Sequence, residues 1–221
     1  MIKIENLTKS YRTSQGRHYV FKDLNVELPT GKSVALIGRN GAGKSTLLRM
    51  IGGIDRPDSG NIITDKSISW PVGLSGGFQG SLTGRENVKF VARLYAEKHE
   101  LREKIDFVED FAELGKYFDM PIKTYSSGMR SRLGFGLSMA FHFDYYLVDE
   151  VTAVGDARFK KKCADLFGEI RSRSNLIMVS HSLKSLSECC DVAFFLGRDN
   201  KISYFNDIQH ALQLYKKEEG I

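Results

Sequence analysis

Apolar and polar residues alternate at two places in the first part of the chain, and this alternation predicts strands. Residues 2–7 (IKIENL) show the pattern, and residues 21–28 (FKDLNVEL) repeat it before PTGK turns the chain. Successive side chains of a strand point to opposite faces, so a half-buried strand alternates in this way. The two stretches therefore predict an antiparallel ribbon at the N-terminus.

A continuous apolar run follows at residues 33–38 (SVALIG). A strand that is buried on both faces has no polar side, and it therefore reads as such a run. The next stretch, residues 45–53 (STLLRMIGG), reads as the helix that this strand feeds. The order of strand, glycine-rich loop and helix is typical of a nucleotide-binding unit.

Apolar residues take helical spacing between residues 84 and 115. Two faces recur at intervals of three and four residues, one formed by Val88, Val91, Ala92 and Tyr95 and the other by Ile105, Val108, Phe111 and Ala112. We expect a helical lobe at about residues 84–140, inserted into the sheet domain.

Strands and helices alternate in the second half of the chain. The expected elements are a helix from about residue 126, a strand at 145–149 (YYLVD), a long helix near residues 157–171, a strand at 175–180 (NLIMVS), a short helix, a strand at 192–197 (VAFFLG) and a terminal helix. This alternation favours a parallel core. The predicted fold class is α/β, with a mostly parallel core sheet, an N-terminal antiparallel β ribbon and an inserted α-helical lobe. We expect one domain over residues 1–221, with no additional C-terminal domain.

Composition narrows the class of protein. The chain has 221 residues, of which 42% are hydrophobic and 27% charged, so it can bury a sizeable core. It has no apolar run of about 18 residues and no secretory signal, and we expect a cytoplasmic protein. The net charge of +5 is spread along the chain without an arginine-rich arm, so nucleic acid is not an expected partner. The three cysteines lack metal-ligand spacing.

Residues 38–45 (GRNGAGKS) match the phosphate-loop pattern G-x-x-x-x-G-K-[ST] in its proper context between a strand and a helix. Backbone amides and the positive end of the helix bind phosphates, Lys44 reaches the outer phosphates, and the hydroxyl of Ser45 ligates magnesium. The residues expected to bind the nucleotide here are Gly38, Arg39, Asn40, Gly41, Ala42, Gly43, Lys44, Ser45 and Thr46.

Two acidic residues end the apolar strand at residues 145–149. Asp149 is placed to hold magnesium through water, and the adjacent Glu150 can polarise the attacking water as a general base. An acidic pair at a strand end can also be a solvated turn, but the phosphate loop upstream favours the catalytic role. His181 follows another apolar strand, which we expect beside the strand of Asp149.

Together these motifs resemble the ATP-binding subunit of ABC transporters, and the resemblance covers nearly the whole chain. It implies ATP and Mg²⁺ as ligands and a contact of His181 with the γ-phosphate. Two stretches compete for the signature of that family, LSGG at residues 74–77 and YSSGM at residues 125–129. In the family the signature opens a helix that leads into the magnesium-binding strand about twenty residues later.

The spacing favours the second stretch. Gly128 lies 21 positions before Asp149, whereas LSGGFQG precedes the helical lobe. The resemblance therefore assigns the contact with ATP to Ser126, Ser127 and Gly128, which can also cap the helix. It leaves Gln79, 35 positions after Lys44, as the glutamine that contacts magnesium and water.

Other positions follow from the same resemblance. Asp156 in DEVTAVGD closes the loop that crosses the dimer interface, although Val151 replaces the usual proline. Tyr11 is expected to stack on adenine, with Tyr19 as a competitor. The implied catalytic residues are Lys44, Gln79, Glu150 and His181, and the implied metal ligands are Ser45, Gln79 and Asp149.

The stretches YSSGM, LTGREN and DEVTAVGD are similar to the subfamily that energises export of capsular polysaccharides and O-antigens in bacteria. This similarity implies a homodimer that hydrolyses ATP at the cytoplasmic face of the inner membrane. It also implies a separate integral membrane permease as a partner, with a polysaccharide, in closest likeness a capsular one, as the indirect substrate.

Two other classes compete with this interpretation. An ABC-type ATPase that acts as a mechanical clamp without a membrane partner usually carries a coiled-coil insertion or two linked halves, and this sequence has neither. A phosphate-loop kinase would need an acceptor pocket and should lack the signature. ATP hydrolysis without an acceptor separates an ATPase from a kinase.

Overall fold

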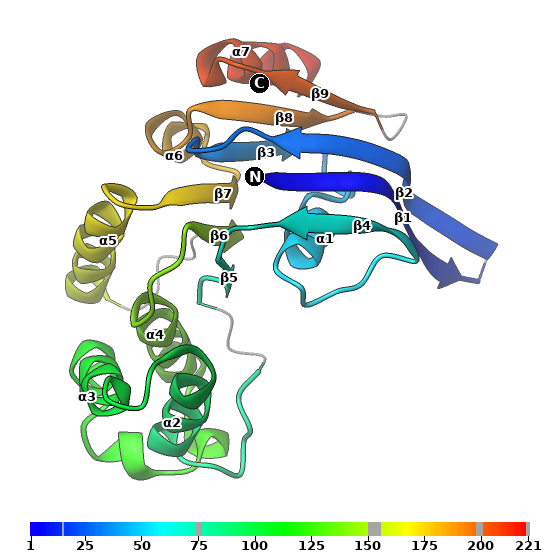
Figure 1. Cartoon of the computed structure of the whole chain (residues 1–221). Helices are drawn as coiled ribbons and strands as arrows, with labels where there is room; N and C mark the ends of the chain where they lie inside the picture. The colour runs from blue at the N-terminus through cyan, green and yellow to red at the C-terminus, as the bar shows by residue number, and fades with distance from the viewer. Residues whose placement is uncertain (15, 74–76, 150–155, 198–200, 220–221) are drawn as a thin grey trace. The chain divides into compact units, whose positions relative to one another are not determined.

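The computed structural model describes residues 1–14, 16–73, 77–149, 156–197 and 201–219 (Figure 1). Contacts divide the chain into two compact units, which are described one at a time. The first unit consists of Met1–Pro71, Phe143–Glu150 and Arg173–Ile221, and the second of Val72–His142 and Val151–Ser172.

The first unit contains a three-stranded antiparallel sheet in the order β2-β1-β4. Its strands are β1 (Ile2–Thr13), β2 (Gly16–Leu28) and β4 (Ser59–Thr64). The predicted N-terminal ribbon is confirmed, and both of its strands are longer than the alternating stretches. The pattern did not predict β4, because none of its side chains is buried and it joins the sheet through backbone pairing with β1.

The second sheet of this unit has six strands in the order β5-β6-β7-β3-β8-β9. They are β3 (Val34–Gly38), β5 (Ile68–Pro71), β6 (Tyr145–Asp149), β7 (Asn175–Val179), β8 (Val192–Leu196) and β9 (Ile202–Phe205). All neighbours pair in parallel except β9, which is antiparallel to β8. The parallel core is confirmed, and β3 is buried along its whole length.

The described residues of the first unit form three helices, α1 (Lys44–Ile51), α6 (Leu183–Cys189) and α7 (Ile208–Glu219). Helix α1 contacts β3, β5, β6 and β7, and its apolar face joins one core cluster with residues of both sheets. The members of this cluster include Ile4, Phe21, Leu36, Leu48, Leu147 and Ile177. Since β3 and α1 are both packed into this core, the loop that joins them is anchored at its two ends.

The second unit is helical. It contains α2 (Gly84–Tyr95), α3 (Leu101–Ala112), two 3₁₀ turns (Gly115–Asp119 and Ile122–Thr124), α4 (Ser127–Met139) and α5 (Ala157–Arg171). The ring of Phe111 on α3 lies 5.7 Å from the ring of Phe135 on α4 and 5.4 Å from that of Phe159 on α5. This aromatic cluster joins the three helices.

Local sequence explains where α2 begins. The side chain of Thr83 accepts a hydrogen bond from the Glu86 amide, and the Glu86 carboxylate accepts one from the Thr83 amide, which completes a capping box. The guanidinium of Arg85 donates to Asp119 and to Glu109, both at 2.6 Å. The start of α2 is thereby tied to α3 and to the following 3₁₀ turn.

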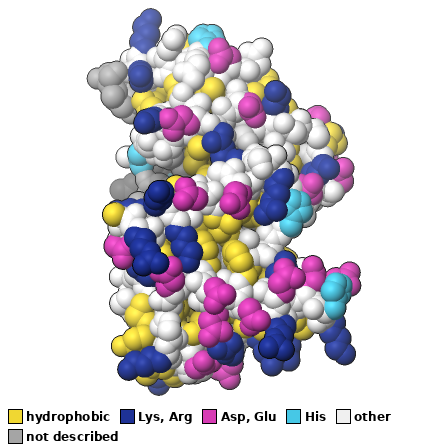
Figure 2. Space-filling model, turned by 90° about the vertical axis from the view of Figure 1, so that its left-hand side faces the viewer, with side chains coloured by type: hydrophobic (Ala, Val, Ile, Leu, Met, Phe, Trp, Pro, Cys, Tyr) yellow, Lys and Arg dark blue, Asp and Glu magenta, His cyan; other side chains and the backbone are white. Residues whose placement is uncertain are grey.

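The surface carries both signs of charge. On the face shown in Figure 2, Lys and Arg side chains are interspersed with Asp and Glu side chains. In the part of the chain that the structure describes, no helix has both the length and the apolar character needed to cross a bilayer.

Candidate nucleotide-binding site

Glycines shape the phosphate loop between β3 and α1. Gly38, Gly41 and Gly43 have φ angles of 147°, 82° and 95°, a region that side chains disfavour. A Cβ on Gly43 would lie 2.5 Å from Cγ1 of Val20, and a Cβ on Gly38 would lie 2.6 Å from the carbonyl oxygen of Leu196. Only glycine fits at these two positions, so the loop lies directly against β2 and β8.

The N-terminus of α1 is open to an anion. No side chain caps it, and its first turn contains no acidic residue. The backbone amides of the first turn, which have no acceptor within the helix, and the helix dipole together favour a phosphate at this position. The ammonium of Lys44 lies 2.6 Å from the Gly38 carbonyl oxygen and 2.8 Å from that of Arg39, so it is held against the loop. These groups fit the phosphates of a nucleotide.

Two oxygen ligands meet beside the loop. The hydroxyl of Ser45, in the first turn of α1, lies 3.1 Å from Oδ1 of Asp149 at the end of β6. In a parallel sheet the carboxyl ends of strands share one edge, which brings these two residues together. Hydroxyl and carboxylate oxygens are the ligands that Mg²⁺ prefers, so the pair fits this ion.

Two more predicted catalytic residues belong to this unit, and the structure describes only His181 of the two. His181 is exposed and follows β7. Strand β7 pairs with β6, so the prediction that these two strands are adjacent is confirmed. Glu150 lies outside the described residues, and its role as a general base stays a prediction.

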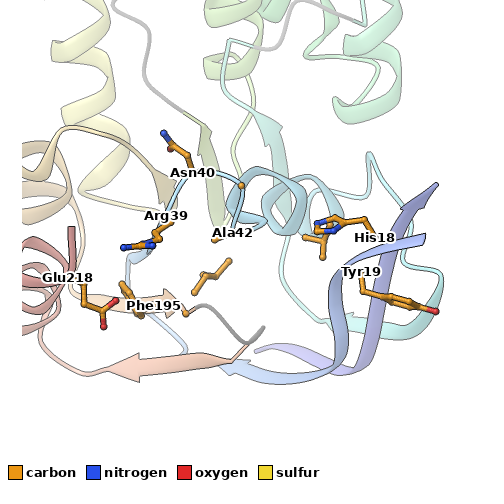
Figure 3. Close-up of a pocket in the computed structure, with 11 residues that line it drawn as sticks. His18, Tyr19, Arg39, Asn40, Ala42, Phe195 and Glu218 are labelled. Atoms are coloured by element: carbon orange, nitrogen blue, oxygen red, sulfur yellow. The ribbon is translucent and has the colours of Figure 1, made fainter. Parts of the chain in front are cut away.

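A cavity of about 240 Å³ lies beside the phosphate loop (Figure 3). It is lined by His18, Tyr19, Val20, Arg39, Asn40, Gly41, Ala42, Phe195, Leu196, Gly197 and Glu218. In Figure 3, Arg39, Phe195 and Glu218 lie on one side of Ala42, and His18 and Tyr19 lie on the other. The cavity extends from the phosphate loop toward β2, which carries Tyr19, the alternative to Tyr11 for stacking on adenine.

Tyr11 has a different environment. Its hydroxyl donates to Oδ2 of Asp55 at 3.0 Å, and the other carboxylate oxygen of Asp55 accepts from Lys9 at 2.7 Å. The hydrogen bond from Lys9 is the main reason why the pKa of Asp55 is lowered, so this carboxylate is charged and holds Tyr11 in place. Stacking of Tyr11 on adenine stays a prediction, and Tyr19 is the tyrosine that lines the cavity.

Gln79 belongs to the second unit, where Asn87 holds its backbone. The side-chain oxygen of Asn87 accepts from the Gln79 amide at 2.8 Å, and its side-chain nitrogen donates to the Gln79 carbonyl at 3.2 Å. Asn87 is buried, while Gln79 is exposed. Sequence reasoning missed this positioning role, because it treated the LTGREN stretch only as a mark of resemblance.

The YSSGM stretch opens a helix, as predicted. The hydroxyl of Ser126 accepts from the Met129 amide at 3.2 Å, and α4 begins at Ser127. A Cβ on Gly128 would meet no described atom closer than Oγ of Ser126, at 3.9 Å, which is an ordinary van der Waals contact. Of the rival LSGG stretch, residues 74–76 lie outside the described residues, and residues 77–83 belong to no helix.

Asp156 caps the next helix of this unit. Its Oδ1 accepts from the Phe159 amide at 2.9 Å, and its Oδ2 accepts from the guanidinium of Arg132 at 3.1 Å. The amide of Phe159, followed by the charge of Arg132, lowers the pKa of Asp156. Asp156 is therefore an anionic N-cap of α5 and the partner of a cation on α4.

The fold and the phosphate loop define an ATP-binding cassette. Residues 21–153 match the ABC transporter family, and the chain belongs to this family as an ATP-binding subunit.

Its relatives cover the chain from end to end. It is 77% identical to the polysialic acid transport ATP-binding protein KpsT of Escherichia coli, covering 100% of this chain and 99% of the relative. It is 44% identical to the capsule polysaccharide export ATP-binding protein CtrD of Neisseria meningitidis serogroup B, covering 97% and 98%. The dimeric cassette MJ0796 bound to ADP and Pi shares the fold, with a TM-score of 0.74 and 22% identity over 94% of this chain and 99% of that one.

Two glycine substitutions separate contact from backbone strain in the phosphate loop. Gly43→Ala combines a left-handed φ with a clash against β2, and we expect it to lower the free energy of unfolding by about 3 kcal/mol. Gly41→Ala has a similar φ but open space around the new Cβ, so a loss of about 1 kcal/mol is expected. Urea unfolding measures both values. Equal losses would mean that β2 does not hold the loop.

Proposed function

We propose that this chain is the ATP-hydrolysing subunit of a capsular polysaccharide exporter and that two copies work with a separate integral membrane permease. The observation that carries the proposal is the 77% identity, over the whole chain, to the polysialic acid transport ATP-binding protein. The similarity to the capsule polysaccharide export protein CtrD supports the same substrate class. Polysialic acid is the first polymer to assay.

In this proposal the phosphate loop binds ATP, and Lys44 stabilises the charge of the outer phosphates. Mg²⁺, when held by Ser45, Asp149 and Gln79, would neutralise phosphate oxygens during the transfer. Glu150 accepts the proton of the attacking water, and His181 contacts the γ-phosphate. The hydroxyl and carboxylate 3.1 Å apart, beside an open helix end, support the magnesium part of this assignment.

The two copies are proposed to close head to tail. Ser127 and Gly128 of one chain then face the ATP on the phosphate loop of the other chain. The start of α4 supports this role, because a helix N-terminus favours an anion and a Cβ on Gly128 would meet no described atom closer than Oγ of Ser126, at 3.9 Å. Hydrolysis would separate the γ-phosphate from one of the two sides and reopen the pair.

Replacement of the proposed base tests this cycle. Glu150→Gln should retain ATP binding and lose at least about 100-fold in turnover, because the amide cannot accept the proton of water. With Mg²⁺ and ATP the variant should accumulate as a dimer, measured by light scattering, while the apo form stays monomeric. Near-normal hydrolysis by the folded variant would remove Glu150 from the base role.

The permease requires a docking surface, and α2 offers one. Phe90 and Leu94 are one helical turn apart, so they share a face, and they are 61% and 65% exposed. Large apolar side chains that are this exposed and adjacent favour contact with another protein. We place the dimer at the cytoplasmic face of the inner membrane, bound to the permease through this surface.

Substitution of this surface tests the partnership in cells. The double variant Phe90→Ser and Leu94→Ser should leave the ATPase of the purified subunit unchanged but reduce its recovery with membranes and cause the polysaccharide to accumulate inside the cell. Ile63→Ser is a matched control, since Ile63 on β4 is also exposed, at 49%. The export function is wrong if the wild-type chain captures no membrane protein and if cells that lack the chain retain no polysaccharide inside.

A further inference from the structure

Arg132 connects three elements of the second unit. It lies on α4 one helical turn after Gly128, and its side chain is only 20% exposed. Its Nη2 is 3.1 Å from Oδ2 of Asp156, its Cζ is 4.4 Å from the ring centroid of Phe159, and its Nη1 is 3.9 Å from Oε2 of Glu113. A planar guanidinium with a partner at each side has one orientation, so its contacts fix α4 against the start of α5.

The bond between Arg132 and Asp156 is separate from the cap of α5. Asp156 uses Oδ1 to accept from the Phe159 amide and Oδ2 to accept from Arg132. An asparagine at position 156 could still cap the helix through its side-chain oxygen, but it would carry no charge for Arg132. The ion pair can therefore be removed while the cap stays.

Lys162 is a second cation beside the carboxylate of Glu113. Nζ of Lys162 on α5 lies 2.8 Å from Oε1 of Glu113, and it also lies 4.8 Å from the ring centroid of Phe111. The two cations Arg132 and Lys162 thus face the two anions Glu113 and Asp156 around the edge of the aromatic cluster. The ring of Phe111 stacks on that of Phe135 and meets that of Phe159 edge-on, so the aromatic packing of α3, α4 and α5 does not require the charge of Arg132.

Arg132 joins two segments that are proposed to contact the partner subunit in the dimer. One is the N-terminal end of α4 with Ser127 and Gly128, and the other is the start of α5, where the segment that follows Asp149 along the chain ends at Asp156. We infer that Arg132 is a positioning residue, which keeps these two segments in one arrangement so that both reach the nucleotide of the partner subunit together. This inference rests on the proposed function.

Arg132→Met tests the inference, since methionine keeps apolar contact with Phe159 and lacks the charge. We expect kcat and the affinity of the ATP-dependent dimer to fall about tenfold, the effect of losing one charged hydrogen bond. The affinity of the separate subunit for ATP should change by less than about twofold. Arg102→Met is the control, because Arg102 forms an exposed pair with Asp106 in the same unit and should leave kcat unchanged.

A double-mutant cycle separates positioning from a loss of stability. Asp156→Asn alone should lower kcat as Arg132→Met does, and the double variant should lose no more than either single variant, because both remove one interaction. Unfolding midpoints of all variants are measured alongside. If Arg132→Met fails to fold, Asp156→Asn carries the same test.

The outcomes distinguish this inference from the function on which it rests. Folded variants with the kcat and dimer affinity of the wild type, or losses that add in the double variant, would overturn the positioning role alone. A wild-type chain that neither hydrolyses ATP nor dimerises with it would contradict the proposed function, and the inference would fall with it.

Discussion

The contact between the phosphate loop and its two neighbouring strands is the constraint on which the first unit depends. Gly43 lies so close to Val20 of β2, and Gly38 so close to Leu196 of β8, that neither position has room for a side chain. The loop is therefore held by both sheets of the unit, and α1 starts in a fixed direction. This placement brings Ser45 to Asp149 and leaves the first amides of α1 open to phosphate.

An aromatic core holds the second unit together. Phe111 joins three helices, and the residues proposed to act on the nucleotide lie at helix starts or on a clamped loop rather than in that core. Ser126 caps α4, Asp156 caps α5, and Asn87 holds the backbone of Gln79. Short polar side chains thus orient the functional segments, while the apolar packing supplies the rigidity.

Much of this arrangement could be predicted from the chain, and the exceptions have physical reasons. The runs at residues 34–38 and 145–149 are apolar because both faces are buried, so they were found almost to the residue. Strands β4 and β9 were missed because most of their side chains are exposed or half-buried and backbone pairing holds them. The roles of Asn87 and Arg132 were missed because they arise from contacts with Gln79 and Asp156, which no periodicity reveals.

The central claim is that the phosphate loop of one copy and the YSSGM stretch of another form a single ATP site. Mixing two inactive variants, Lys44→Ala and Gly128→Asp, tests it most directly, because a mixed dimer contains one pair of intact partners. We predict that the mixture hydrolyses ATP faster than the two variants do separately, once copurification through a tag on one variant shows that mixed dimers form. Mixed dimers that form without any gain in hydrolysis would contradict the claim.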